Sequence, residues 1–155
     1  AENGGKPIRS RVGHSFIKAM MAETNAVFGG EHSGHFYFSD FWRADSGMLA
    51  ALFALAELSG SDKSLSELLL PYNRYVLSGE INTRVSDTAA SLDLIRETFK
   101  ADHELDELDG VTVTAKDYWF NVRPSNTEPL LRLNVEAVDE PTMKKVRDKV
   151  LKLIG

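Results

Sequence analysis

Residues 120–137 read FNVRPSNTEPLLRLNVEA, and this stretch decides how the C-terminal half of the chain folds. On both sides of its centre, large apolar residues alternate with polar ones, which is typical of half-buried β-strands. The central residues, RPSNTEP at 123–129, cannot continue a strand because two prolines fence a short run of polar side chains. The stretch therefore predicts strand structure with a polar interruption whose purpose needs an explanation.

The pattern outward from this stretch predicts an α+β domain. We expect strands at 75–85 and 130–137, two strands around a turn within 109–123, and helices at 86–100 and 140–154. Ser86 or Asp87 can cap the first of these helices, and Pro141 suits the first turn of the second. Leu131, Leu133 and Val135 should face the same way.

The N-terminal half gives a less complete pattern. We expect a strand at 6–12, a helix at 14–24, a strand–loop–strand unit at 26–41, a helix at 44–60 and a short helix ending at Pro71. The helix at 44–60 is apolar nearly all round, so it should be buried on more than one side. Residues 1–58 alone bury little surface, which suggests that something upstream is missing.

These elements predict two domains joined by a linker. We expect a partial domain with a mixed α/β sheet at 1–60, a linker at 61–71, and an α+β domain with an antiparallel sheet and two helices at 72–155.

Composition narrows the class of protein. The 155 residues carry a net charge of −5, which argues against nucleic-acid binding through a basic surface. There is no cysteine, which excludes disulfides and thiolate zinc sites and fits a reducing cytoplasm. The longest apolar run, 48–56, is far shorter than the roughly 18–20 residues that cross a bilayer. We therefore expect a cytoplasmic protein without a nucleic-acid or membrane partner.

The interruption at 123–129 has the parts of a phosphate site. Arg123 offers a planar two-pronged donor, and Ser125 and Thr127 offer hydroxyls. Asn126 tolerates a left-handed conformation, so successive backbone N–H groups from Ser125 to Thr127 can point into one concavity. A plain polar turn between two strands explains the same residues.

A second unusual stretch is GGEHSGHFYF at 29–38. If it is extended, Glu31, Ser33 and His35 share one side and suit vicinal sugar hydroxyls. The alternative is a glycine-rich hairpin whose histidines are exposed and bind nothing. A metal site at Glu31, His32 and His35 is a weaker hypothesis, because side-chain alternation along a strand places His32 and His35 on opposite faces. His14, in VGHSFIK, is either a functional residue or an ordinary helix-start residue.

Together and in this order, VGHSFIK, GGEHSGHFYF, ADSG and RPSNTEPLLRL resemble the α-D-phosphohexomutases, most closely the bacterial phosphomannomutase/phosphoglucomutase branch. The resemblance covers residues 6–137. It implies that 1–60 is the C-terminal part of domain 3 of a four-domain enzyme and that 72–155 is domain 4, which has a TATA-box-binding-protein-like fold. Such an enzyme interconverts hexose 1-phosphate and hexose 6-phosphate, of mannose or glucose, through a phosphoserine and a bisphosphorylated sugar.

The resemblance also assigns roles to residues. It implies that Glu31, Ser33 and His35 contact sugar hydroxyls and that His14 and His35 support catalysis. It implies phosphate binding by the loop residues Arg123, Ser125, Asn126 and Thr127. His32 stands where the glucosamine branch commonly has glutamine, which favours mannose or glucose, although membership in the phosphoglucosamine branch stays an alternative.

Two of the family's motifs are absent from the sequence. Neither the T-x-S-H-N-P phosphoserine loop nor the DGDxDR loop that holds Mg²⁺ occurs in the 155 residues. We therefore expect no metal ligands in this chain, a Mg²⁺ site only in the full-length enzyme, and no phosphoryl transfer by the chain alone. Its expected partners are a phosphorylated hexose and the upstream domains of the same enzyme. A stand-alone phosphosugar-binding module is the other hypothesis.

Overall fold

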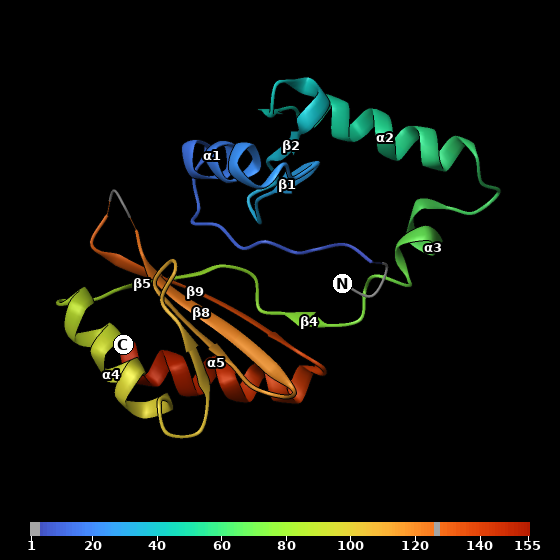
Figure 1. Ribbon diagram of the computed structural model, residues 1–155. Coiled ribbons are helices and arrows are strands. Elements are labelled where there is room, and N and C mark those ends of the chain that lie inside the picture. The colour runs from blue at the N-terminus through green and yellow to red at the C-terminus, as the bar shows by residue number, and fades with distance from the viewer. Residues whose placement is uncertain (1–3, 126–127) are drawn as a thin grey trace. The chain divides into compact units, whose positions relative to one another are not determined.

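The computed structural model describes residues 4–125 and 128–155, and the chain divides into two compact units, 1–72 and 73–155 (Figure 1). No helix among the described residues is long and apolar enough to span a bilayer.

Unit 1 is a small antiparallel sheet with helices attached. Its elements are α1 (His14–Thr24), β1 (Phe28–Gly30), β2 (Phe36–Phe38), the 3₁₀ turn η1 (Ser39–Phe41), β3 (Ala44–Asp45), α2 (Gly47–Ser59) and α3 (Leu65–Leu69). The strands are ordered β1-β2-β3. Ile17 and Met21 of α1 and Tyr37 of β2 are buried together, and this contact fixes α1 against the sheet.

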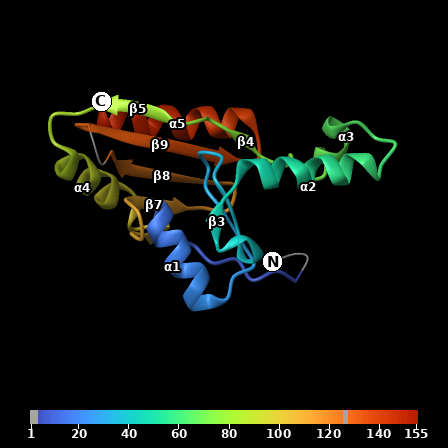
Figure 2. The same ribbon diagram turned by 90° about the horizontal axis from the view of Figure 1, so that it is seen from above.

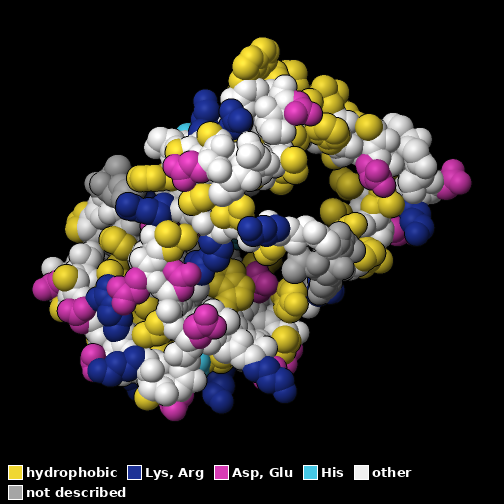
Figure 3. All heavy atoms as spheres, in the orientation of Figure 1, with side chains coloured by type: hydrophobic (Ala, Val, Ile, Leu, Met, Phe, Trp, Pro, Cys, Tyr) yellow, Lys and Arg dark blue, Asp and Glu magenta, His cyan; other side chains and the backbone are white. Residues whose placement is uncertain are grey.

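Two expectations for unit 1 are wrong. Residues 6–12 form no strand, because no other described strand of this unit pairs with them and a strand needs a hydrogen-bonded partner. The apolar helix α2 has no buried residue: Met48 is 79% exposed and Phe53 is 59% exposed, although Phe53 stacks on Phe38. A helix that is apolar on all sides is buried only if other elements pack against several of its faces. In unit 1, the contact of Phe53 with Phe38 lies on one face of α2. Hydrophobic side chains consequently show on the surface of this part of the chain (Figure 3).

Unit 2 is an α+β domain, as expected. Its elements are β4 (Val76–Leu77), β5 (Ile81–Arg84), α4 (Thr88–Phe99), β6 (Glu104–Asp106), β7 (Val111–Thr114), β8 (Tyr118–Pro124), β9 (Leu130–Ala137) and α5 (Glu140–Ile154). The strand order is β4-β9-β8-β7-β6, with β5 also paired to β9, and every pairing is antiparallel. Both helices cover one face of the sheet (Figures 1 and 2).

The core of unit 2 lies between this sheet face and the two helices. Its fully buried members are Ile95, Phe99, Val111, Val113, Phe120, Val122, Leu131, Leu133, Val135 and Val150. Alternate residues of β9 point to the opposite face and stay partly exposed, among them Arg132 and Asn134. The side chain of Asp87 caps α4 by accepting a hydrogen bond from the Ala90 amide at 3.0 Å.

The expected strand at 75–85 is two strands. Ser78 separates them: its amide donates to the Val135 carbonyl and its hydroxyl accepts from the Val135 amide, both at 2.9 Å. A side chain thus replaces one rung of the backbone ladder, and β4 and β5 pair with different parts of β9. The short strand β6 was not expected, because three residues carry too little periodicity to predict a strand.

Candidate functional site

The GGEHSGH stretch forms the turn of the β1–β2 hairpin. The Glu31 amide donates to the His35 carbonyl and the Gly34 amide donates to the Glu31 carbonyl, both at 2.9 Å. The stretch is therefore a glycine-rich hairpin turn, which was the alternative, and the condition under which Glu31, Ser33 and His35 would share one side of an extended strand is not met. The turn instead places Glu31 and His35 opposite each other at its base and leaves Ser33 exposed at its tip.

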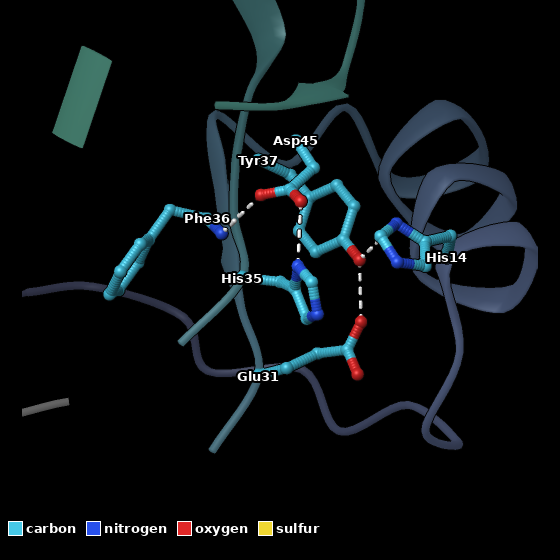
Figure 4. Close-up of polar contacts among 6 residues, drawn as sticks. All are labelled: His14, Glu31, His35, Phe36, Tyr37 and Asp45. Atoms are coloured by element: carbon cyan, nitrogen blue, oxygen red, sulfur yellow. Dashed lines mark hydrogen bonds and ion pairs between the residues drawn. The ribbon is translucent and has the colours of Figure 1, made fainter. Parts of the chain in front are cut away.

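Tyr37 connects Glu31 of the hairpin turn with His14 of α1, and these residues form the candidate sugar site. Its side chain is fully buried, and its hydroxyl donates to Glu31 Oε1 at 2.5 Å and lies 2.9 Å from His14 Nδ1 (Figure 4). Because the single hydroxyl proton goes to Glu31, the oxygen accepts from His14 Nδ1–H, and the network assigns that tautomer to His14. Burial, followed by the hydrogen bond to Glu31, raises the pKa of Tyr37, so the phenol remains a donor.

Asp45 holds the second histidine. Its Oδ2 lies 2.6 Å from His35 Nδ1, and its Oδ1 accepts from the Phe36 amide at 2.9 Å. The pairing of β3 with β2 brings Asp45 opposite Tyr37 and next to His35. The hydrogen bond from the Phe36 amide, and then the contact with His35, lower the pKa of Asp45, so it is a carboxylate at neutral pH. A neutral His35 that donates to this carboxylate through Nδ1 carries its lone pair on Nε2.

Five polar side chains from three elements and a turn thus converge in unit 1: His14 from α1, Glu31 and His35 from the hairpin turn, Tyr37 from β2 and Asp45 from β3 (Figure 4). The rings of His14 and His35 meet edge to face with centroids 4.7 Å apart. Tyr37 and Asp45 were not predicted. Tyr37 has the pattern of an ordinary core residue, and Asp45 has that of a helix-start residue within ADSG, so only the pairing of the strands identifies them.

The second candidate site is the loop between β8 and β9. It joins the end of β8 at Pro124 to the start of β9 at Leu130, and the two strands pair antiparallel. The Ser125 amide donates to the Leu130 carbonyl at 2.9 Å, so the expectation that this amide points into a phosphate concavity is wrong. The amide is occupied because it continues the hairpin ladder by one residue. Asn126 and Thr127 lie outside the described residues.

Arg123 is paired rather than free. Its Nη2 lies 3.3 Å from Glu80 Oε2, and Nη1 of Arg132 lies 3.3 Å from the other oxygen of Glu80. Arg123 and Arg132 are cross-strand partners on β8 and β9, so the sheet sets the two guanidinium groups side by side. Two cations against one carboxylate leave a net positive charge beside the loop. Arg132 was not predicted, although counting the register outward from the loop would have placed it opposite Arg123.

Mg²⁺ does not fit the donor groups of unit 1. Among the described residues, one group of His, Asp and Glu side chains is close enough to hold a metal ion: His14, His35 and Asp45. Mg²⁺ takes near-octahedral oxygen ligands, whereas two of these three donors are imidazole nitrogens. These three residues are therefore not a Mg²⁺ site.

Comparisons with known proteins identify both units. Residues 1–75 match the family described as phosphoglucomutase/phosphomannomutase, alpha/beta/alpha domain III, and residues 80–153 match its C-terminal domain. A phosphomannomutase of Methanocaldococcus jannaschii is 50% identical over 152 residues, which are 98% of this chain and 34% of that protein. A phosphomannomutase of Escherichia coli K12 is 37% identical over 96% of this chain and 33% of that protein.

A solved structure gives the same result. A phosphoglucomutase/phosphomannomutase family protein from Burkholderia thailandensis superposes with a TM-score of 0.82 at 30% identity, over 98% of this chain and 33% of that one. The chain thus spans about a third of the length of the relatives it matches.

Proposed function

The chain belongs to the phosphoglucomutase/phosphomannomutase family, and we propose that it supplies the sugar-recognition and phosphate-binding parts of a cytoplasmic phosphohexomutase. The reaction is the interconversion of hexose 1-phosphate and hexose 6-phosphate, with mannose or glucose as the hexose. The relatives named phosphomannomutase support this substrate class. The phosphoserine and the Mg²⁺ loop of the resembled enzymes are not among the 155 residues, so we expect no turnover by this chain alone.

The observation that carries the proposal is the hydrogen-bonded group around Tyr37 in unit 1. Sugar hydroxyls are both donors and acceptors, and a site for them needs fixed groups of both kinds. Glu31 and the Nε2 lone pair of His35 offer acceptors, and the Ser33 hydroxyl offers a donor at the tip of the same turn. Tyr37 holds Glu31 and Asp45 holds His35 by hydrogen bonds, so both side chains are already oriented before a sugar binds.

His35 has the arrangement of a proton acceptor. Phosphoryl transfer to a sugar hydroxyl requires that the hydroxyl lose its proton as the new P–O bond forms. A histidine whose Nδ1–H is held by a carboxylate presents Nε2 as a base, and the resulting imidazolium is stabilised by the same carboxylate. In this proposal His35 takes the proton, Asp45 is its positioning residue, and His14 is a neighbouring supporting group.

Unit 2 supplies the phosphate contacts. We assign the phosphate to Arg123, the Ser125 hydroxyl and the loop residues Asn126 and Thr127, with Arg132 as an additional cation. Glu80 holds both guanidinium groups in place and competes with the incoming phosphate for them. A dianionic phosphate offers more acceptor oxygens than one carboxylate, so it can displace Glu80 from at least one arginine.

Calorimetric titration of the chain with mannose 1-phosphate and glucose 1-phosphate tests this function. The substitution Arg123→Ala should weaken binding by roughly 1.5–3 kcal/mol, the usual range for charged hydrogen bonds. Arg84→Ala is the matched control, because Arg84 is an exposed arginine 4.0 Å from Glu128 and has no assigned role. Equal affinities for the chain and for the Arg123→Ala variant would contradict the phosphate assignment.

A further inference from the structure

We propose that His14, His35 and Asp45 form a binding site for a divalent transition-metal ion of the Zn²⁺ class. One ring nitrogen of each histidine and one carboxylate oxygen of Asp45 lie within 4.8 Å of one another. Ligands at the usual Zn²⁺ distances of about 2.0–2.2 Å are separated by less than this, so small side-chain rotations close the site. Two imidazoles and one carboxylate are a recurrent ligand set for such ions.

The surrounding hydrogen bonds have the form of a metal site's outer shell. The Nδ1 of His14 bonds to the Tyr37 hydroxyl, which bonds in turn to the Glu31 carboxylate. Metal-binding histidines usually donate their second ring N–H to such a partner, which fixes the tautomer and makes the ligating nitrogen more basic. The remaining oxygen of Asp45 is held by the Phe36 amide. His14 and Asp45 are therefore oriented by groups outside the proposed ligand set, whereas His35 is held by Asp45 itself.

The three ligands come from separate elements that the fold holds together. His14 begins α1, His35 ends the hairpin turn and Asp45 lies on β3. The buried residues Ile17, Met21 and Tyr37 pack α1 on the sheet between them. The site is thus built on packed secondary structure, which gives precise ligand placement.

The donor chemistry selects the ion. Imidazole nitrogens with one carboxylate suit Zn²⁺, Co²⁺ and Ni²⁺ and disfavour Mg²⁺. Three protein ligands leave a fourth position for water or for an oxygen of a bound molecule. Because the chain has no cysteine, thiolate coordination cannot be the source of any Zn²⁺ binding that is measured.

An ion at this site changes the proposed sugar site. The ion would bind both His35 and Asp45. The imidazole of His35 would then lose its hydrogen bond to Asp45 and could no longer accept a proton. We therefore expect the ion to reduce phosphosugar binding. This consequence rests on the proposed function, whereas the ion site does not.

Direct binding of Zn²⁺ and Co²⁺ to the intact chain tests the site. We expect one equivalent of Zn²⁺ in calorimetry, and visible d–d absorption bands of low-coordinate Co²⁺ that Zn²⁺ abolishes. His14→Ala and His35→Ala should each reduce Zn²⁺ affinity at least about tenfold, since even outer-shell losses cost 10–100-fold. His32→Ala and His103→Ala are the matched controls, because they remove the chain's other two histidines and leave the proposed ligands intact.

Amide NMR spectra of each variant check that it folds. A spectrum unchanged outside unit 1, together with lost Zn²⁺ binding, supports the site. Binding that is weak and non-saturating, or that the His14 and His35 variants leave unchanged, overturns it. Phosphosugar titration with and without Zn²⁺ separates the two proposals: saturable Zn²⁺ binding that leaves phosphosugar affinity intact keeps the ion site and removes the sugar role of His35.

Discussion

Gly110 lies where unit 2 tolerates no side chain, and Gly110→Ala should lower its stability severely. The residue precedes β7 with φ of +72°, and a Cβ built there would lie 2.3 Å from the Val122 carbonyl oxygen and 2.7 Å from the Cα of Arg123. The left-handed conformation costs a non-glycine residue about 1–2 kcal/mol, and relieving an overpacked contact costs typically 1–3 kcal/mol. The obstructing atoms are backbone, so they cannot rotate away. We expect a total loss of about 2–5 kcal/mol in the free energy of unfolding.

Gly79→Ala is the matched control. Gly79 also has a positive φ, of +69°, but a Cβ there would meet nothing within 4 Å. It should therefore lose only the conformational part, about 1–2 kcal/mol. Urea denaturation monitored by tryptophan fluorescence measures both losses, and a Trp42→Phe background leaves Trp119 of β8 as the single reporter. Equal losses for the two variants would refute the steric argument.

Three further outcomes are expected. Glu80→Gln should raise the affinity for mannose 1-phosphate about two- to fivefold. The reason is that Glu80 competes with the phosphate for Arg123 and Arg132, and a partly exposed ion pair is worth up to about 1 kcal/mol. An unchanged or lower affinity in calorimetry would show that Glu80 does not compete. The amide resonance of Phe36 should titrate with a midpoint below the ordinary Asp value of about 3.9, and the titration should vanish in Asp45→Asn. The pKa of Asp45 is lower in the folded chain than in the unfolded chain, so the carboxylate stabilises the fold above about pH 4. This contribution is lost as the pH falls through the pKa of the folded state. A stability difference between Asp45→Asn and the unsubstituted chain that persists at low pH would show that the pKa of Asp45 is not lowered by folding.

Local signals in the sequence predicted most elements of the fold. The helices at 14–24 and 140–154 appear with the expected bounds, because helical spacing and end signals lie within the segments themselves. The buried residues of β9, Leu131, Leu133 and Val135, were predicted for the same reason, because the alternation of apolar and polar residues along one strand shows which side chains face the core. The antiparallel pairing of β6 with β7, of β7 with β8 and of β8 with β9 follows from the short connections between these consecutive strands.

Features that depend on partners distant in sequence were not predicted. The segment 6–12 has the alternation of a strand but no described strand beside it in unit 1, and α2 has the composition of a buried helix without the neighbours to bury it. The candidate sites show the same limit. Tyr37 and Asp45 come together through the pairing of β2 with β3, and Glu80 reaches Arg123 and Arg132 across the fold; neither contact is visible in a single sequence.

An amide NMR titration of the isotopically labelled chain with mannose 1-phosphate can detect phosphosugar binding both at the hairpin turn of unit 1 and beside Arg123 in unit 2. We expect mannose 1-phosphate to shift the amide resonances of the hairpin turn around Glu31 and His35 and the amide resonance of Ser125, whereas inorganic phosphate should shift only that of Ser125. Resonances that stay unmoved at both places, up to millimolar ligand, would contradict this expectation.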